Sequence, residues 1–364
     1  MGQSAHDFAM AMGAPQVVLA RALKRGGAPT VASRFVQRLA TLGAEQWTEA
    51  VARGAGWRAL AARLDTPASS PLLGQPEPRP PLDLRPRALS VTAIETLRRD
   101  PYAIFAERIL DLKPLGALDS QPGAADIGMG VHAVLRALAD EWPQTPPPAH
   151  ARALLLARLR AELAPFFADP AWRAFRWPQI EAGLDYVLAH EAKYRPDIAR
   201  VYGEIDGATD LRLADGTMFR LSARADRIEL LRNGAARIID YKTGAPPSQK
   251  QAKAGFSPQL TLEAAMLARG AFAGLPAARA EQLRYLKFGG RDGGSLHDPV
   301  GKGVGIDALV DEHWTQLRNM LDWFRILGNG YRSRPYVQFA GRFGDYDHLA
   351  RVKEWSGAGA QDAT

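Results

Sequence analysis

The chain has 364 residues, of which 46% are hydrophobic and 23% are charged, as in an ordinary globular protein of one or two domains. It contains no cysteine, which excludes disulfides, thiolate zinc sites and thiolate-held iron–sulfur clusters. Metal ligands must therefore come from His, Asp, Glu or backbone oxygen, a set that favours magnesium, manganese or calcium. The net charge of +7 permits nucleic-acid binding without requiring it. Since no apolar run is long enough to span a membrane and no secretory signal is present, we expect a cytoplasmic protein with no membrane partner.

The first 86 residues differ in composition from the rest. Residues 1–66 are rich in Ala, Leu and Arg, which predicts short helices broken near Pro15 and Pro29. They offer too little core to form a domain alone, so we expect a helical appendage. Residues 67–86 contain seven prolines, which is typical of an extended linker. The main domain is then expected over residues 87–364.

Helices are expected at the start of this domain. Thr92 and Glu95 have the spacing of a capping box at a helix start, and Asp100-Pro101 predicts a break in that helix. The helix is expected to resume with Tyr102, Phe105 and Ile109 on one face. Further helices are predicted over residues 129–141, 149–165 and 176–195.

Alternation of apolar and polar residues then replaces the helical period. Residues 201–242 alternate in this way, with turn signals at Asp215-Gly216 and Asn233-Gly234, and predict a β-meander. A helix over residues 258–269, a strand over 282–288 and a helix over 306–327 follow. The main domain is thus expected to contain both helices and strands.

The turn at Asn233-Gly234 allows two registers for its hairpin. A two-residue loop would pair Asp226 with Tyr241 and place Asp240 on the opposite face of the sheet. A three-residue loop, Arg232-Asn233-Gly234, would pair Asp226 with Asp240, Ile228 with Ile238 and Glu229 with Arg237. The second register makes two favourable cross-strand pairs, each contributing roughly 0.2–1 kcal/mol, so we predict the three-residue loop.

That register places two carboxylates and a lysine on one face of the hairpin. Asp226 and Asp240 repel each other on this mostly apolar face, and a divalent cation between them resolves the conflict. Lys242 points the same way and can stabilise negative charge on a phosphate. The alternative interpretation is a surface hairpin with an Asp–Lys salt bridge.

The motif Ile239-Asp240-Tyr241-Lys242-Thr243-Gly244, after Ala225-Asp226-Arg227-Ile228, resembles the core of the RecB-like branch of the PD-(D/E)XK nuclease superfamily. Gly130-Val131-His132 resembles the metal-binding histidine motif of that branch. Pro258-Gln259-Leu260 resembles its glutamine motif. The resemblance implies a PD-(D/E)XK nuclease core, which is an α/β fold with a central mixed β-sheet flanked by helices.

Segments outside the core resemble the C-terminal part of AddB-type helicase/nuclease subunits. They are His6-Asp7-Phe8, Gly26-Gly27-Ala28-Pro29-Thr30, and a tail with Asp345-Tyr346-Asp347-His348-Leu349 and Glu354-Trp355. This resemblance implies the nuclease domain of an AddAB-type double-strand-break repair complex, acting on DNA as a single-strand exonuclease or in end processing. An AddA-type helicase/nuclease subunit is the implied partner, and residues 1–66 would be the end of the helicase-like region.

The resemblance also implies roles for individual residues. His132, Asp226, Asp240 and the backbone carbonyl of Tyr241 would hold Mg²⁺ or Mn²⁺. Lys242 would be catalytic and Gln259 would assist it. Glu204 and Asp206 are further candidates to approach the metal, and Arg224 and Arg227 to contact phosphate.

The sequence departs from the resembled pattern in several places. Asp100 stands where a cysteine of an iron–sulfur clamp would be expected, so the resemblance implies no cluster here. Instead, Tyr346, Leu349 and Trp355 are expected to pack the tail on the first helix of the domain. Glu263 stands where a tyrosine would follow the glutamine. No Gly-x-x-x-x-Gly-Lys-[Ser/Thr] motif occurs, so no ATP site is expected.

Two other functions remain open at this point. In the first, the domain is a non-catalytic DNA-binding or scaffold module with a retained nuclease fold. In the second, it is an idle fragment that depends on a partner. Because Asp226, Asp240 and Lys242 are all present, the sequence favours the enzyme.

Overall fold

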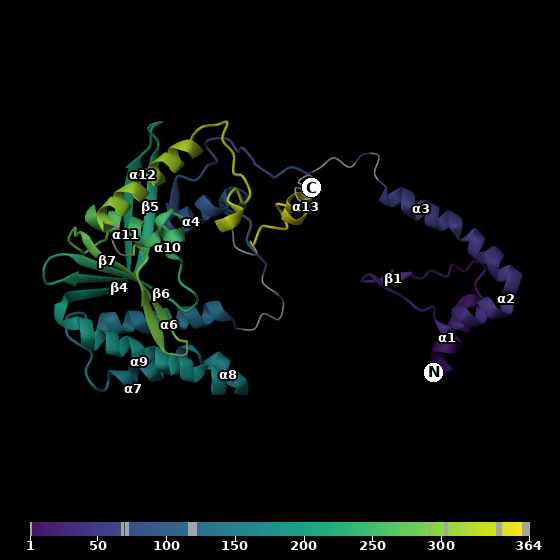
Figure 1. The fold of residues 1–364 in the computed structure, drawn as a ribbon, viewed down its shortest axis with the longest axis horizontal. Helices are drawn as coiled ribbons and strands as arrows, with labels where there is room; N and C mark the ends of the chain where they lie inside the picture. The colour runs from purple at the N-terminus through teal and green to yellow at the C-terminus, as the bar shows by residue number, and fades with distance from the viewer. Residues whose placement is uncertain are drawn as a thin grey trace. The chain divides into compact units, whose positions relative to one another are not determined.

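A computed structural model describes residues 2–66, 69, 73–115, 122–290, 292–301, 305–339 and 344–358. Its contacts divide the chain into two units, Met1–Leu72 and Leu73–Thr364 (Figure 1). No helix in the described part is long and apolar enough to cross a membrane.

Among its described residues, the first unit contains the predicted helices but no packed core. Its elements are α1 (Gly2–Met12), β1 (Lys24–Arg25), β2 (Ala28–Pro29), α2 (Arg34–Arg53) and α3 (Ala55–Asp65). None of the three helices has a buried residue. Local interactions hold it, such as the stacking of Phe8 on Phe35 at 5.0 Å between ring centroids and the Ser33 side chain that caps α2. The expectation of too small a core is therefore met by the described residues.

The second unit is built on a six-stranded sheet in which β3, β5, β6, β7 and β8 follow one another and β4 also pairs with β5. The pairs β3–β5 and β6–β7 are parallel and the others are antiparallel, so the sheet is mixed, as predicted. The strands are β3 (Ala88–Ser90), β4 (Ile198–Arg212), β5 (Met218–Leu231), β6 (Ala236–Lys242), β7 (Ala280–Phe288) and β8 (Gly294–His297).

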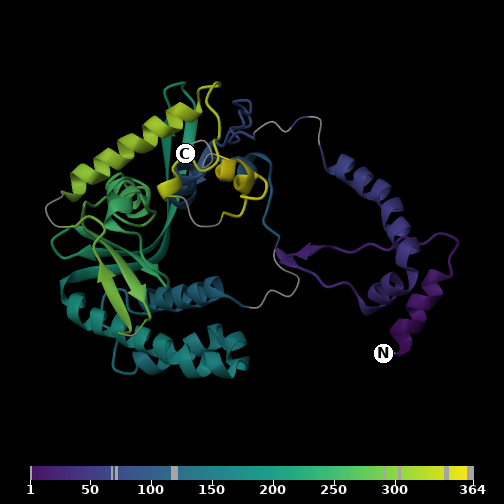
Figure 2. The same cartoon turned by 45° about the vertical axis from the view of Figure 1, so that its right-hand side comes forward.

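Helices cover both faces of this sheet (Figures 1 and 2). On one face lie α6 (Ala124–Glu141), α7 (Ala151–Glu162), α8 (Pro170–Phe175) and α9 (Trp177–Tyr194). On the other lie α4 (Val91–Arg99), α11 (Gln259–Ala268) and α12 (Ile306–Phe324). Because strand side chains alternate, Ile239 and Tyr241 pack under α6 and α9, whereas Ile238 packs with α11 and α12. This completes the expected α/β fold.

Short elements connect the layers. They are α5 (Pro101–Ile104), η1 (Phe105–Ile109), η2 (Ala164–Ala168), η3 (Arg195–Asp197), α10 (Gln249–Lys253), η4 (Val337–Phe339) and α13 (Val352–Ala358). The break predicted at Asp100-Pro101 separates α4 from α5. The predicted cap at Thr92 is wrong, because the Ser90 side chain accepts from the Ala93 backbone N–H and α4 begins at Val91.

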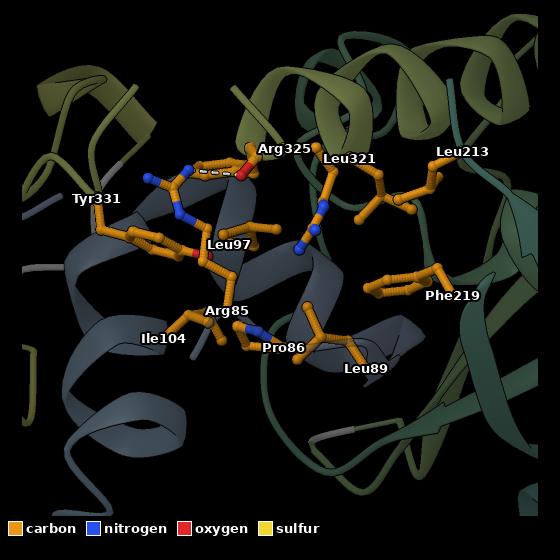
Figure 3. A pocket seen from close by; sticks show the side chains of 11 residues that line it. Arg85, Pro86, Leu89, Leu97, Ile104, Leu213, Phe219, Leu321, Arg325 and Tyr331 are labelled. Atoms are coloured by element: carbon orange, nitrogen blue, oxygen red, sulfur yellow. Dashed lines mark hydrogen bonds between the residues drawn. The ribbon is translucent and has the colours of Figure 1, made fainter. Parts of the chain in front are cut away.

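Residues 73–86, predicted as the second part of a linker, belong to the second unit and bind its surface. The backbone N–H groups of Tyr331 and Ser333 donate to the carbonyls of Pro78 and Pro76 at 2.8 and 3.0 Å. Arg85 is 2% exposed, and Figure 3 shows it among the residues that line a pocket. Its guanidinium donates to the Phe324 carbonyl at the end of α12 (2.5 Å) and to the carbonyls of Ile326 and Leu327 just beyond it (both 3.1 Å). Proline content indicated an extended segment, but not that a buried arginine would anchor it.

The C-terminal tail packs on the first helices of the domain, as expected. Tyr102 forms a small core with Ala350 and Val352, and Tyr346 and Trp355 pack against it. The Asp100 carboxylate, at the position of the expected cysteine, accepts from the Arg334 backbone N–H at 2.9 Å. Leu349 is 44% exposed, so its expected packing role is wrong; the apolar contact comes from its neighbour in sequence.

We predict that Arg85→Lys lowers the free energy of unfolding by about 2 kcal/mol, because an ammonium group cannot reproduce the guanidinium fork that binds several carbonyls. Urea unfolding measures this change. Arg79→Lys is the matched control, since Arg79 is 57% exposed and its ion pair with Glu77 contributes little. Equal effects of the two substitutions would contradict the anchoring role of Arg85.

Candidate active site

The hairpin between β5 and β6 has the predicted three-residue loop. Leu231 N–H donates to the Ala235 carbonyl at 2.8 Å, and Gly234 between them has a φ of 84°. Only glycine adopts that left-handed conformation without strain. Ile228 pairs with Ile238 and Glu229 with Arg237, as the cross-strand arguments required.

This register brings Asp226 and Asp240 to one end of the hairpin. The last regular pair is Arg227 with Ile239, and each aspartate lies one residue beyond it on its own strand. Asp226 Oδ2 accepts a hydrogen bond from the Tyr241 backbone N–H at 2.8 Å, which joins the side chain of β5 to the backbone of β6. The two carboxylates therefore lie near each other on the same face, and the charge of Asp226 opposes the ionisation of Asp240.

A basic side chain lies beside each of these carboxylates. Lys242 Nζ lies 2.7 Å from Asp240 Oδ2. His132, which α6 contributes from the neighbouring layer, places Nδ1 3.4 Å from Asp226 Oδ1. The structure thus brings together His132, Asp226, Asp240 and Lys242, with the Tyr241 backbone between the two aspartates.

Burial shifts the protonation of this group. Burial and the charge of Asp226 raise the pKa of Asp240 to about 6, against the opposing effects of Lys242 and His132. Burial alone would lower the pKa of Lys242, but the adjacent Asp240 raises it above its usual value. In the same way the contact with Asp226 outweighs burial and raises the pKa of His132. Lys242 consequently stays protonated at neutral pH.

The residues are of the kind that fits a divalent cation. Carboxylate, imidazole and backbone oxygen are ligands for Mg²⁺ and Mn²⁺, and Asp240 Oδ2 is buried with no hydrogen bond of good geometry. Within the described residues, however, no three His, Asp or Glu side chains are drawn together as a metal-binding group. Instead, Asp240 lies beside Lys242 and Asp226 lies beside His132.

Comparison with known proteins decides the family. The sequence model that describes the PD-(D/E)XK nuclease superfamily matches residues 88–335 of this chain. These residues cover the sheet and both helical layers. The chain belongs to this superfamily. Its members are in general metal-dependent nucleases, and this supports a nuclease at that coarse level.

Curated relatives of this superfamily member come from Rickettsia. An uncharacterized protein of Rickettsia bellii is 30% identical over 190 residues, which are 51% of this chain and 22% of the relative. An uncharacterized protein of Rickettsia felis is 29% identical over 198 residues, which are 51% of this chain and 22% of that relative. The chain thus spans about a fifth of the length of these relatives. A solved structure of SSO0001 aligns over 65% of this chain and 77% of its own at 13% identity, with a TM-score of 0.28, which is too low to support an argument.

Gln259, the expected helper of the nuclease site, binds within its own helix. It opens α11, and its amide Nε2 donates to Glu263 Oε1 at 3.1 Å. Glu263 in turn lies in the field of Asp240, Asp226 and Lys242. Gln259 is therefore linked to the carboxylates through a glutamate, and within the described residues no hydrogen bond joins it to Lys242.

The weaker sequence candidates separate into two groups. Glu204 lies near the site, since it raises the pKa of His132 and forms an ion pair with Arg136 at 3.3 Å. Its φ of 41° is unusual for a non-glycine residue in a strand. Asp206 instead forms an exposed ion pair with Arg224 at 2.8 Å.

Arg227 is wrong as a phosphate contact, because it is 2% exposed and belongs to a buried ion network on the opposite face of the sheet. Its guanidinium lies 2.6 Å from Glu191 and 2.7 Å from Glu229. It also donates to the Tyr241 hydroxyl at 3.4 Å. Arg195 and Arg237 complete the network, at 3.0 Å from Glu191 and 2.6 Å from Glu229.

The network holds β5 and β6 together on the face of the sheet opposite the carboxylates, since Arg227 follows Asp226 on β5 and Tyr241 follows Asp240 on β6. Sequence analysis found only its Glu229–Arg237 pair, through the register of the hairpin. The Arg-x-Glu spacing on β5 was a further signal of charges on one buried face. That Glu191 of α9 joins this network could be seen only in the tertiary structure.

We predict that the metal-free protein loses stability relative to Asp240→Asn as pH rises from about 4 to about 6. The unfolded state releases the Asp240 proton near its usual pKa of 3.8, whereas the folded state retains it to about pH 6. The difference corresponds to roughly 3 kcal/mol. Urea unfolding of both variants across this pH range, with chelator present, measures it. Asp206→Asn is the control. Because Arg224 lowers the pKa of Asp206, the unsubstituted protein should gain stability relative to Asp206→Asn as pH rises, which is the opposite sign.

We also predict that Arg227→Met costs about 3–5 kcal/mol, because it leaves two buried glutamates with fewer cationic partners. Arg224→Met, the same change on the same strand, removes only an exposed ion pair and should cost less than about 1 kcal/mol. Guanidinium unfolding compares the two. A small loss in both variants would show that the buried network does not fix this part of the sheet.

Proposed function

We propose that this superfamily member is a metal-dependent DNA nuclease domain that hydrolyses DNA phosphodiesters with Mg²⁺ or Mn²⁺. The observation that carries the proposal is the end of the β5–β6 hairpin, where two carboxylates and Lys242 share one face. A purely structural hairpin gains nothing from placing Asp226 beside a buried Asp240, since the arrangement raises the cost of ionising Asp240. A site for a cation and a phosphate explains the arrangement.

His132, Asp226, Asp240 and the Tyr241 carbonyl would hold the cation. When bound, a divalent cation polarises a phosphoryl oxygen and neutralises the charge of the leaving oxygen. Asp240 must be ionised to serve it, so binding should weaken as pH falls below about 6. His132 must give up its proton for the same reason, which adds to this pH dependence.

Lys242 would supply a positively charged side chain to the active site. Because its pKa is raised, it remains an ammonium at neutral pH and acts as a hydrogen-bond donor, not as a base. It is 32% exposed while Asp240 is 2% exposed, so its side chain reaches the surface from which a DNA strand approaches. There it would stabilise the charge that develops on the non-bridging oxygens of the phosphate.

At a finer level, we propose an AddB-type nuclease domain that works with an AddA-type subunit in double-strand-break repair. The motifs at both ends of the chain support this reading, as does the tail that packs on Tyr102. Single-stranded DNA from the partner is then the substrate, for exonuclease or end-processing action. A pull-down with the AddA-type subunit tests the assembly separately from the chemistry.

A non-catalytic DNA-binding module is the second candidate. It is favoured by one observation, namely that Lys242 and His132 already neutralise the carboxylates without a metal. In that case the ion pairs would be the functional state, and added metal would leave the protein unchanged.

We predict that the protein degrades labelled single-stranded DNA with Mg²⁺ or Mn²⁺ but not with Ca²⁺ or chelator. Asp240→Asn should abolish cleavage, and Lys242→Met should reduce it by about 10²-fold or more, because each removes charge required at the phosphate. Asp206→Asn is the matched control and should retain activity. Circular dichroism verifies that each variant is folded.

Cleavage that survives in Asp240→Asn would contradict the assignment of the active site. DNA binding without cleavage, with or without the AddA-type partner, would favour the non-catalytic module. Cleavage that appears only with the partner would support the enzyme as part of the complex.

A further inference from the structure

Glu263 is a fully buried carboxylate in a helix that is otherwise almost entirely apolar. Every residue of α11 from Leu260 to Leu267 is buried, and Glu263 itself is 0% exposed. Its Oε1 accepts from the Gln259 amide at 3.1 Å. Its Oε2 is buried and has no hydrogen-bond partner among the described residues. An unsatisfied buried oxygen is uncommon in proteins and requires an explanation.

The charges that surround Glu263 are those of the candidate active site. After burial, the charge of Asp240 is the largest influence that raises the pKa of Glu263, and Asp226 adds to it. Lys242 acts in the opposite direction. Tyr285, which pairs with Asp240 across β6 and β7, is under the influence of Asp240, Glu95 and Glu263 together. Glu263 therefore belongs to the same cluster, although it comes from a different element.

Glu263 differs from the other acids of this cluster in its partners. Each of the others has a cationic side chain beside it: Glu95 with Arg99 at 3.0 Å, Asp226 with His132 at 3.4 Å, and Asp240 with Lys242 at 2.7 Å. In the part of the chain that the structure describes, Glu263 forms no ion pair. The cluster thus contains one carboxylate without a basic side chain beside it among the described residues, and that group has an unpaired oxygen.

We propose that Glu263 supplies a further carboxylate oxygen to a divalent cation in this site, an inference that rests on the proposed function. The cation provides the positive charge that the cluster lacks and gives Oε2 a partner. Gln259 is then a positioning residue, because its amide holds Oε1 and leaves Oε2 for the cation. This role also accounts for a carboxylate at a position where an apolar or neutral side chain would fit the buried helix better.

Titration with Mn²⁺, followed by the electron paramagnetic resonance signal of the free ion, tests the proposal. Glu263→Gln keeps the size of the side chain and an acceptor for Gln259 but removes the charge. We expect it to raise the Kd for Mn²⁺ by about tenfold or more, because affinity in oxygen-ligand sites depends on the number of charged ligands. Glu312→Gln on α12 is the matched control, since Glu312 is exposed, and should change Kd by less than about twofold.

Thermal unfolding provides a readout that a merely structural role would not reproduce. Glu263→Gln should raise the Tm of the metal-free protein, since it removes a buried carboxyl with an unpaired oxygen, and should reduce the rise in Tm on adding Mn²⁺. Glu263→Met serves as a second variant if the first does not fold. A normal Mn²⁺ Kd in the folded variant would overturn this proposal and leave the proposed function intact. Failure of the unsubstituted protein to bind Mn²⁺ would overturn both.

Discussion

The pairing of β5 with β6 is the constraint on which the rest of this molecule depends. A slip of one residue would move Asp226 to the face occupied by Arg227 and would separate it from Asp240. Gly234, in its left-handed conformation, allows the three-residue loop that sets the register. On the opposite face, Arg227 and Tyr241 secure the same two strands through a buried network. The position of the carboxylates is therefore determined from both faces of the sheet.

The charges of the two faces are balanced in different ways. In the buried network every glutamate has an arginine within 3.0 Å, so the charges are compensated within the protein. In the candidate site the compensation is incomplete, because Asp240 has a raised pKa and Glu263 has no ion-pair partner among the described residues. A fully compensated network suits a structural role, whereas incomplete compensation suits a site that receives a cation. The stability lost in the site is consistent with a functional origin.

The ends of the second unit are held by polar contacts to backbone groups. Arg85 joins the proline-rich segment to the end of α12, and Asp100 accepts from the backbone near the tail. Together with the packing of Trp355 and Tyr346, these contacts hold both ends of the domain in place. They also keep α4 in place, and α4 contributes Glu95 to the charged cluster.

The sequence by itself determined the class of fold, the strands of the meander, the hairpin register and the pair of aspartates with Lys242. These features depend on local rules, namely side-chain alternation, turn chemistry and cross-strand pairing, so a single segment contains the information. The short strands β3 and β8 could not be predicted, because three or four residues carry too little pattern and form only against a neighbouring strand. Only the tertiary structure decided that Arg227 is buried, that the segment before residue 87 is fastened by Arg85, and that Glu263 lies in the field of Asp240. Each of these depends on elements distant in sequence, and burial changes what the same charged side chain can do.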